Sequence, residues 1–295
     1  MQDLYWDDYR VAYQVAQSGS LSKAARQLKC NHATVLRHVN RLEQALNIKL
    51  FIRHQRGYKL TDAGSILVNE MPSIYAEFNR LENLLGSVEQ DINGNLRITT
   101  LVEFSSLLNP ALLEFRKAYP NLRIQLISTD EIIPLASGAV HVSVRAGQEP
   151  QDPDLIARKI MTINMAYYAT DEYVQQFGLP QKIEEYNQHN WVMPSVEKHH
   201  IPHVKQVLRH LDNERVVYQS NQFLDIESAV KTGIGIGLIS EIGAAACSNL
   251  HKLQLDDDVT YEANGLWYVY HRDLKHNAKV KTLYQYLLKH LIPEG

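Results

Sequence analysis

The sequence predicts a multi-domain α+β protein with three parts in order: a winged helix-turn-helix, a long linker helix and a larger α/β domain. Residues 1–61 combine three short helical patterns with a pair of strands. Residues 62–92 repeat apolar positions every three and four residues, and residues 93–295 alternate between strand and helix patterns. These patterns place the expected domain boundaries after residues 61 and 92.

The charge of the chain is distributed unevenly. The formal net charge is −3 over 295 residues, but residues 1–60 hold ten Lys or Arg against four Asp or Glu, a balance of +6. The remainder then holds 20 basic and 29 acidic residues, a balance of −9. A basic segment on an acidic body is typical of a domain that binds a polyanion, although a solvated surface with a chance excess of bases gives the same count.

Several classes of protein are disfavoured by what the sequence lacks. It has no N-terminal secretory signal, and no uncharged apolar run approaches the roughly 20 residues that span a bilayer. Its two cysteines, Cys30 and Cys247, indicate neither a disulfide scaffold nor a cysteine zinc site. His199, His200 and His203 lack the other ligands of a zinc site, and no catalytic motif stands out. We therefore expect a cytoplasmic protein that is not an enzyme and has no membrane span, metal or cofactor.

The first three helical patterns are short and closely spaced. Residues 9–17 and 21–28 are separated by a break in which Gly19 suits a helix C-terminus and Ser20 suits the next N-cap. Asn31 is expected to cap a third helix over residues 32–46. That helix carries one apolar stripe, formed by Val35, Val39, Leu42 and Leu46. A helix-turn-helix requires such a stripe, because the opposite face of its second helix must enter the major groove.

The opposite face of the third helix is polar and basic, and a basic hairpin follows it over residues 50–61. Arg can bind guanine, Asn can bind adenine, and a basic wing can neutralise phosphates. The residues expected to contact double-stranded DNA are Asn31, His32, Ala33, Thr34, Arg37, His38, Arg41, Arg53 and Arg56. The alternative is a small helical domain with a surface hairpin that binds no nucleic acid.

The linker carries an apolar heptad that one helix in water cannot bury alone. Its members are Leu67, Met71, Ile74, Phe78, Leu81, Leu85 and Val88. The seam predicts a homodimer, with packing against the chain's own body as the alternative. Pro72 lies inside the pattern, so a kink or a late helix start is expected.

Residues 9–64 resemble the DNA-binding domain of LysR-type transcriptional regulators. The matching positions are Ser18-Gly19-Ser20-Leu21, Ala24-Ala25, Leu28, Arg37, Arg41-Leu42-Glu43, Leu46, Leu50-Phe51, Arg53, Gly57, Leu60-Thr61 and Ala63-Gly64. The start of the third helix departs from the family pattern, and Leu36 stands where a Ser is common; it either reads a thymine methyl or packs. The resemblance implies DNA binding with an unusual operator preference, tetramers built from dimers, and RNA polymerase as a further partner.

The remaining chain resembles, more weakly, the LysR effector domain, which is similar to periplasmic solute-binding proteins with two α/β lobes around a cleft. The matching positions include Leu96, Ile98, Leu112, Phe115, Tyr119-Pro120, Val142-Ser143-Val144-Arg145, Gly233, Gly235-Ile236 and Leu266-Trp267. The resemblance implies a small-molecule effector, anionic or polar, bound near strand ends and helix N-termini. The effector residues it points to are Thr100, Leu101, Val102, Ser128, Thr129, Arg145, Asn221 and Gln222. Ordinary loop capping is the alternative for each of them.

Two other positions of the body bear on this expectation. Arg145 is the expected counter-charge to an anion, and His141 stands where the family often has Asp, which puts a charge role there in doubt. The function expected overall is a DNA-binding regulator modulated by an effector. The alternatives are a solute-binding sensor whose head contacts protein, which the basic head argues against, and an enzyme, for which the sequence offers no catalytic constellation.

Overall fold

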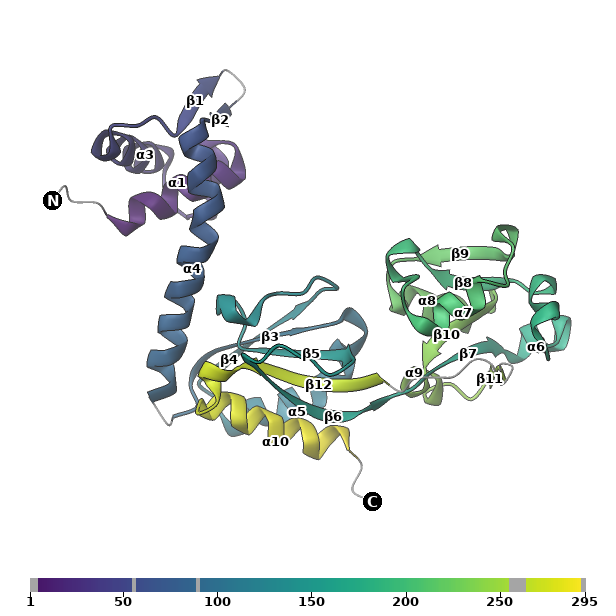
Figure 1. Cartoon of the computed structure of the whole chain (residues 1–295). Helices are drawn as coiled ribbons and strands as arrows, with labels where there is room; N and C mark the ends of the chain where they lie inside the picture. Colours follow the sequence, from purple (N-terminus) through teal and green to yellow (C-terminus); the bar gives the residue numbers. More distant parts are fainter. Residues whose placement is uncertain (1–4, 55–56, 89–90, 255–263, 293–295) are drawn as a thin grey trace. The chain divides into compact units, whose positions relative to one another are not determined.

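The computed structural model describes residues 5–54, 57–88, 91–254 and 264–292. The chain divides into two compact units, which meet within the linker helix between Glu82 and Asn83 (Figure 1). Each unit is described here by itself. We call the first unit the head and the second unit the body.

The head is three helices followed by a two-stranded hairpin and the start of the linker helix. The elements are α1 (Trp6–Ser18), α2 (Leu21–Gln27), α3 (His32–Leu46), β1 (Phe51–His54), β2 (Gly57–Leu60) and α4 (Asp62–Val88). Gly19 ends α1 in the left-handed conformation, and the Ser20 hydroxyl caps α2 by accepting from Lys23 N–H at 3.2 Å. The three helices bury Val11, Val15, Leu21, Ala24, Val35, Val39 and Leu42 in one core. The predicted stripe of the third helix is thus the buried face of α3.

The wing is fixed to the head by a close backbone approach. Gly57 has a φ of 138°, and a Cβ there would lie 2.7 Å from the carbonyl oxygen of Gly19. The next residue, Tyr58, donates its N–H to that same carbonyl at 3.1 Å. Only glycine fits this position, because a side chain would collide with the backbone of the α1–α2 turn.

The linker helix α4 begins at Asp62 and continues through Pro72, so the late start expected from this proline does not occur. Leu67 packs on the head core of the same chain, and Met71 is fully buried. Trp6 of α1 packs against Tyr75 and Phe78 of α4. The first half of α4 is therefore attached to the head.

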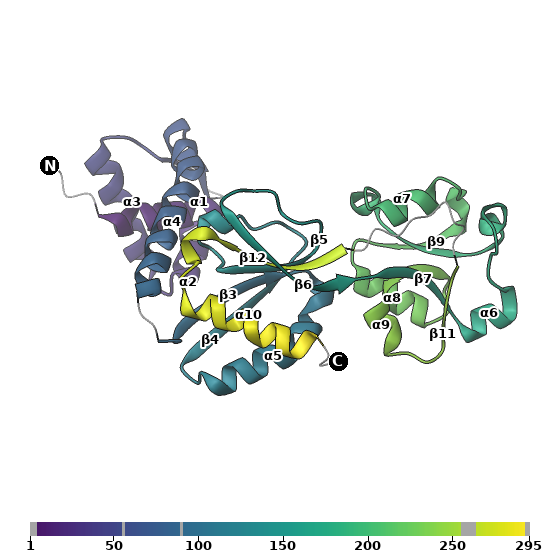
Figure 2. The ribbon, with the colours of Figure 1, turned by 60° about the horizontal axis from the view of Figure 1, so that its bottom comes forward.

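The body consists of two lobes, each built on a five-stranded mixed sheet. Lobe 1 has the strand order β4-β3-β5-β12-β6, in which β4, β3 and β5 are parallel and β12 is antiparallel to both neighbours. Its elements are β3 (Gly94–Thr100), α5 (Ser105–Ala118), β4 (Leu122–Ser128), β5 (Val142–Gly147), β6 (Leu155–Ile163), β12 (Asn264–His271) and α10 (Ala278–Leu291). Helices α5 and α10 lie side by side on one face of this sheet (Figures 1 and 2).

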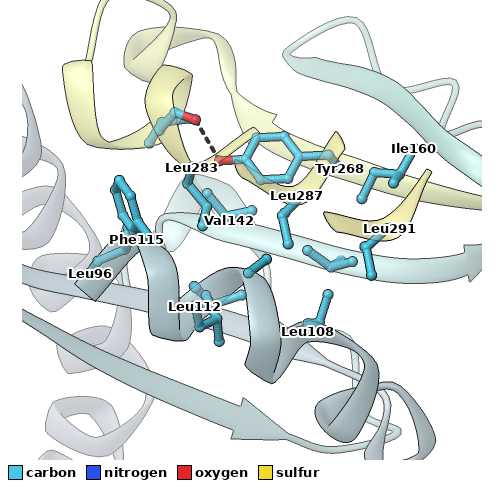
Figure 3. Packing of buried hydrophobic residues seen from close by; sticks show 14 of the residues in the cluster. Leu96, Leu108, Leu112, Phe115, Val142, Ile160, Tyr268, Leu283, Leu287 and Leu291 are labelled. Atoms are coloured by element: carbon cyan, nitrogen blue, oxygen red, sulfur yellow. Dashed lines mark hydrogen bonds between the residues drawn. The ribbon is translucent and has the colours of Figure 1, made fainter. Parts of the chain in front are cut away.

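The core of lobe 1 is the apolar layer between these two helices and the sheet. Phe115 and Leu112 of α5 meet Leu283 and Leu287 of α10 above the strands (Figure 3). Tyr268 of β12 is completely buried, and its hydroxyl donates to the Val280 carbonyl at 2.7 Å, which satisfies its polar end inside the core.

Lobe 2 has the strand order β11-β7-β10-β8-β9, in which β10, β8 and β9 are parallel. Its elements are β7 (Met165–Thr170), α6 (Asp171–Phe177), β8 (Trp191–Pro194), α7 (Pro202–Leu208), β9 (Val216–Ser220), α8 (Phe223–Lys231), β10 (Ile236–Ser240), α9 (Glu241–Ala245) and β11 (Leu250–Lys252). The chain first enters this lobe between β6 and β7, at Asn164. Two lobes connected in this way place loops from both sheets at their junction.

Candidate functional site

The exposed face of α3 is the first candidate site. The Asn31 side chain accepts from Thr34 N–H at 2.7 Å and caps the helix, as predicted. His32, Ala33 and Arg37 are exposed along the first turns. Arg37 forms no hydrogen bond or ion pair with any residue that the structure describes. Its guanidinium is therefore available to a partner outside the chain.

His38 and Arg41 are held from behind by a buried acid of α1. Asp8 is 2% exposed and accepts from Arg41 Nε at 2.6 Å and lies 2.6 Å from His38 Nδ1. Burial alone would raise the pKa of Asp8, but the hydrogen bonds and positive charges of Arg41 and His38 outweigh it and lower that pKa. Arg41 also lies 4.6 Å from the centre of the Tyr5 ring. Both predicted DNA contacts thus have a second role in fixing α3 on α1.

The wing is tied to the same face. Arg53 donates to Asn40 Oδ1 of α3 at 2.7 Å and lies over the Tyr58 ring. Arg56, the other predicted wing contact, lies outside the described residues. Leu36 packs on the head core, which favours the packing alternative over a thymine contact.

Glu43 is a buried acid whose role the sequence did not suggest. Its Oε1 accepts from the backbone N–H of Leu50 at 2.9 Å and of Phe51 at 3.3 Å, and its Oε2 accepts from Lys49 at 2.6 Å. The carboxylate therefore connects the end of α3 to the first strand of the wing.

The apolar seam of α4 is divided between two environments. Leu67 packs on the head core and Met71 is fully buried, whereas Ile74, Phe78, Leu81 and Leu85 are 40–63% exposed, with one side of Phe78 against the Trp6 ring. The side chain of Val88 lies outside the description. The exposed part of the seam is the surface that a second copy of the helix would cover.

The second candidate site lies where strand ends of lobe 1 meet loops of lobe 2. Thr100 and Ser128 end the paired strands β3 and β4, and Thr129 N–H donates to the Thr100 carbonyl at 3.0 Å. The Thr100 hydroxyl is turned inward and donates to the Val144 carbonyl at 2.8 Å. Leu101 and Val102 are half-buried, with Val102 starting the 3-10 helix that follows β3. Asn221 is exposed in the loop before α8.

Arg145 is committed to its own lobe. Its Nη2 donates to the carbonyls of Thr129 at 2.7 Å and Glu131 at 2.5 Å, and its Nη1 donates to that of Asp130 at 3.1 Å. Burial lowers the pKa of Arg145, with Asp130 and Glu103 acting in the opposite direction. The predicted counter-charge for an anion is thus a clamp on the loop after β4.

Asp130 joins the two lobes. Its carboxylate accepts from Gln222 Nε2 at 3.0 Å and lies 3.2 Å from Lys198 Nζ, both of lobe 2. Lys198 also lies 4.7 Å from the centre of the Phe223 ring. Of the predicted effector residues, the structure brings Thr129, Arg145 and Gln222 together around this acid.

Glu103 completes the group on the lobe 1 side. Burial raises the pKa of its carboxyl group, and Asp130 adds to the rise, while its own backbone N–H, Lys198 and Arg145 oppose it. The 3-10 helix that carries Glu103 packs against α8. We call Glu103, Asp130, Arg145, Lys198 and Gln222 the inter-lobe cluster. Three members of the cluster were not predicted, and only weak signals marked them: Glu103 follows a predicted strand, Asp130 follows Thr129, and Lys198 precedes His199 and His200.

His141 is buried at the start of β5 in lobe 1. Its Nδ1 accepts from the backbone N–H of Arg97 at 2.9 Å. Burial, together with the charges of Arg97 and Lys279, lowers its pKa from 6.5 to about 4. The neutral ring is therefore a hydrogen-bond acceptor where the family often has a carboxylate.

Metal-ligand clusters and membrane-spanning helices are both absent from the described residues. These residues contain no group of three or more His, Cys, Asp or Glu side chains placed to hold a metal ion. None of the described helices is both long and apolar enough to cross a membrane.

A helix-turn-helix with a wing, joined by a long helix to a two-lobed α/β domain, defines a class of regulatory proteins with separate DNA-binding and substrate-binding domains. Family models assign both parts. Residues 6–65 match the bacterial regulatory helix-turn-helix of the LysR family, and residues 89–292 match the LysR substrate binding domain. The chain belongs to the LysR family of transcriptional regulators.

Individual relatives agree with this assignment. The regulator CrgA of Neisseria meningitidis serogroup C is 33% identical over 180 residues, which are 61% of this chain and 60% of that protein. The regulator DmlR of Escherichia coli K12 is 28% identical over 292 residues, 95% of this chain and 92% of that one. The match to CrgA thus spans about 60% of that relative's length, whereas the match to DmlR spans 92% of its length.

Solved structures show the same fold. The full-length Vibrio cholerae virulence activator AphB superposes with a TM-score of 0.64 at 20% identity, covering 98% of this chain and 100% of that chain. CrgA of N. meningitidis superposes with a TM-score of 0.58 at 25% identity, with the same coverage. The predicted combination of winged helix-turn-helix, linker helix and two-lobed α/β domain is confirmed.

Proposed function

We propose that this chain is a transcriptional regulator that binds double-stranded DNA through α3 and the wing, and that a small polar molecule at the lobe junction modulates this binding. The DNA-binding part of this proposal rests on one observation: α3 has one face that holds it on the head and another face that is exposed. Its apolar stripe is buried, His38 and Arg41 are anchored on Asp8, and Arg37 projects without a partner among the described residues. A rigid helix that presents a free Arg near its N-terminus suits base reading in the major groove.

The test is retention of labelled DNA from upstream of the protein's own gene, at two salt concentrations and with unlabelled competitor. We expect specific retention that weakens as salt rises, because Lys and Arg displace counterions from phosphates. Arg37→Ala is expected to weaken specific binding by about 1–3 kcal/mol. Arg116→Ala removes the same charge from an exposed position of α5 in the body and serves as the control. Equal binding by Arg37→Ala and wild type would remove α3 from the DNA interface.

The homodimer is proposed on the exposed part of the α4 seam. Four large apolar side chains on one helix face remain 40–63% exposed to solvent, at Ile74, Phe78, Leu81 and Leu85. Leu81→Glu is expected to shift the protein toward monomer in sedimentation, whereas Ile132→Glu, at an apolar loop position that is 82% exposed, is expected to leave the oligomer intact. Assembly of dimers into tetramers follows from the family resemblance.

The remaining parts of the proposal concern the location of the protein, its lack of catalysis and its further partner. The protein acts in the cytoplasm, where its DNA is, and it regulates without catalysing a reaction. An activating role requires contact with RNA polymerase, which is proposed as a further partner. The solute-binding alternative is disfavoured because the helix-turn-helix model covers the head.

A further inference from the structure

The basic groups of the inter-lobe cluster are already engaged inside the chain. Both terminal nitrogens of Arg145 donate to backbone carbonyls of the loop after β4. Lys198 pairs with Asp130 and lies over the Phe223 ring. An incoming carboxylate would therefore have to break an existing contact to gain a cation here.

The polar atoms of the cluster that lack a partner are of a different kind. Glu103 Oε2 and Gln222 Oε1 are buried acceptors without a hydrogen-bond partner among the described residues, and Arg145 Nε is a buried donor in the same situation. Buried polar atoms are normally paired, so each of these calls for a partner. Together these three atoms require hydrogen-bond donors for the two oxygens and an acceptor for the nitrogen.

Two hydroxyl groups meet these requirements. Each carries one donor and two acceptor lone pairs, so a pair can donate to both oxygens and accept from the nitrogen, whereas a carboxylate cannot donate and an ammonium cannot accept. Charge leads to the same choice. Two carboxylates, Glu103 and Asp130, lie with two cations, Arg145 and Lys198, so a charged ligand group of either sign would leave this partly buried cluster with unbalanced charge.

We propose that the inter-lobe cluster recognises a neutral hydroxyl-bearing group of the effector, as found in a polyol or sugar. Glu103 and Gln222 accept from the ligand, Arg145 Nε donates to it, and Asp130 holds the two lobes around it. This inference rests on the proposed function insofar as it takes the lobe junction as the effector site. It narrows the expected anionic or polar effector to one whose group at this position is uncharged.

The experiment is a thermal-shift and titration series on the full-length protein with two matched triplets of probes. The linear triplet is 1,4-butanediol, succinate and 1,4-diaminobutane, and the cyclic triplet is the 1,2-diol, the 1,2-dicarboxylate and the 1,2-diamine of cyclohexane, so that no charged member carries a hydroxyl group. Each triplet offers a neutral, an anionic and a cationic member on one carbon chain or ring. We expect a neutral member, at about ten times its Kd, to raise the melting temperature by about 2–4 °C, with smaller or no shifts from the charged members.

Variants at Glu103 separate recognition from folding. Glu103→Leu removes the acceptor and is expected to weaken binding of the neutral probe about tenfold. Glu103→Gln keeps an acceptor oxygen and is expected to retain most of the affinity. Glu149→Leu, at an exposed position of the same lobe, is the control for the loss of an acid. Each variant must also retain DNA as wild type does, which shows that it is folded.

Two outcomes overturn the proposal: stabilisation only by charged probes, or no stabilisation by any probe, in which case water alone satisfies the cluster. Neither outcome affects DNA retention, so the proposed regulator function would stand. Conversely, a wild-type protein that is stabilised by a neutral probe but retains no DNA would overturn the proposed function and leave the hydroxyl site in place.

Discussion

Asp8 in the head and Glu103 in the body are acids withdrawn from water to different degrees, and their surroundings differ in kind. Asp8 is buried and receives hydrogen bonds from Arg41 and His38, and its pKa is lowered in spite of burial. Glu103 is half-buried and has a buried oxygen with no partner among the described residues, and its pKa is raised by burial. The first acid completes an internal network, whereas the second keeps an acceptor oxygen that the proposed effector group would fill.

The difference shows how one chain can combine a rigid reading head with a responsive sensor. A base-reading helix must keep its register, so its charged side chains are braced from behind. A ligand site must keep some donors and acceptors without a partner inside the chain, because the hydrogen bonds that they form with the ligand contribute to the binding free energy.

The largest effect is expected from Asp8→Ala. This change leaves the His38 and Arg41 side chains without their acceptor, and breaking such a partly buried pair costs about 3 kcal/mol. Peptide-resolved hydrogen exchange of α1 and α3 measures the loss in the head alone. Glu70→Ala, at an exposed position of α4 in the same unit, is the control for the loss of an acid and is expected to leave exchange in α1 and α3 as in wild type. Unchanged protection in Asp8→Ala would mean that the brace contributes nothing to the head.

The brace also marks a limit of reading the sequence. The apolar stripe, the caps at Ser20 and Asn31 and the glycine of the wing could be predicted, because each depends on neighbours along the chain. The pairing of Asp8 with Arg41 depends on how two helices cross, which no local pattern encodes. His38 and Arg41 therefore looked from the sequence like free DNA contacts.

The same reason explains which features of the body could be predicted from the sequence. Strands with continuous apolar runs, such as β10 and β12, were predictable, and so was β3, in which Leu and Ile alternate with polar residues. The short strand β11 and the strand β6 were not, since β6 places Arg and Lys next to each other within an apolar run. Arg145 was found as a candidate from its position, yet its partners are backbone carbonyls contributed by the fold. Residue type predicts what a group can bind, and tertiary structure decides whether it is already bound.

A second, smaller effect concerns His141, whose lowered pKa makes lobe 1 sensitive to acid. Between pH 6.5 and the folded value of about 4, the unfolded chain binds a proton that the folded chain does not, so stability falls as pH falls through this range. Going from pH 7.5 to pH 5 is expected to cost about 2 kcal/mol through this residue. His141→Asn keeps an acceptor for Arg97 N–H but cannot titrate.

Urea unfolding of wild type and His141→Asn at the two pH values measures this term, with the fluorescence of Trp267 in lobe 1 as one probe. The pH-dependent loss is expected to be smaller in His141→Asn by that amount. His210→Asn, at an exposed position of lobe 2, should change nothing. Equal acid sensitivity in wild type and His141→Asn would show that other groups control the acid response.

The smallest expected effect is an increase in stability, and it tests the difference between Asp8 and Glu103 most directly. Glu103→Gln removes a buried charge that lacks a full set of partners, so in the absence of effector it is expected to stabilise the body by on the order of 1 kcal/mol at pH 7.5. Because the folded pKa is raised above 4.5, the folded state holds its proton to higher pH than the unfolded state, and wild-type stability falls as pH rises through this range. The advantage of Gln should therefore shrink toward pH 4.5.

Glu131→Gln, a neighbouring exposed acid whose carbonyl still binds Arg145, is the control in the same unfolding assay. A less stable Glu103→Gln at neutral pH would mean that this carboxylate, like Asp8, already has the partners it needs.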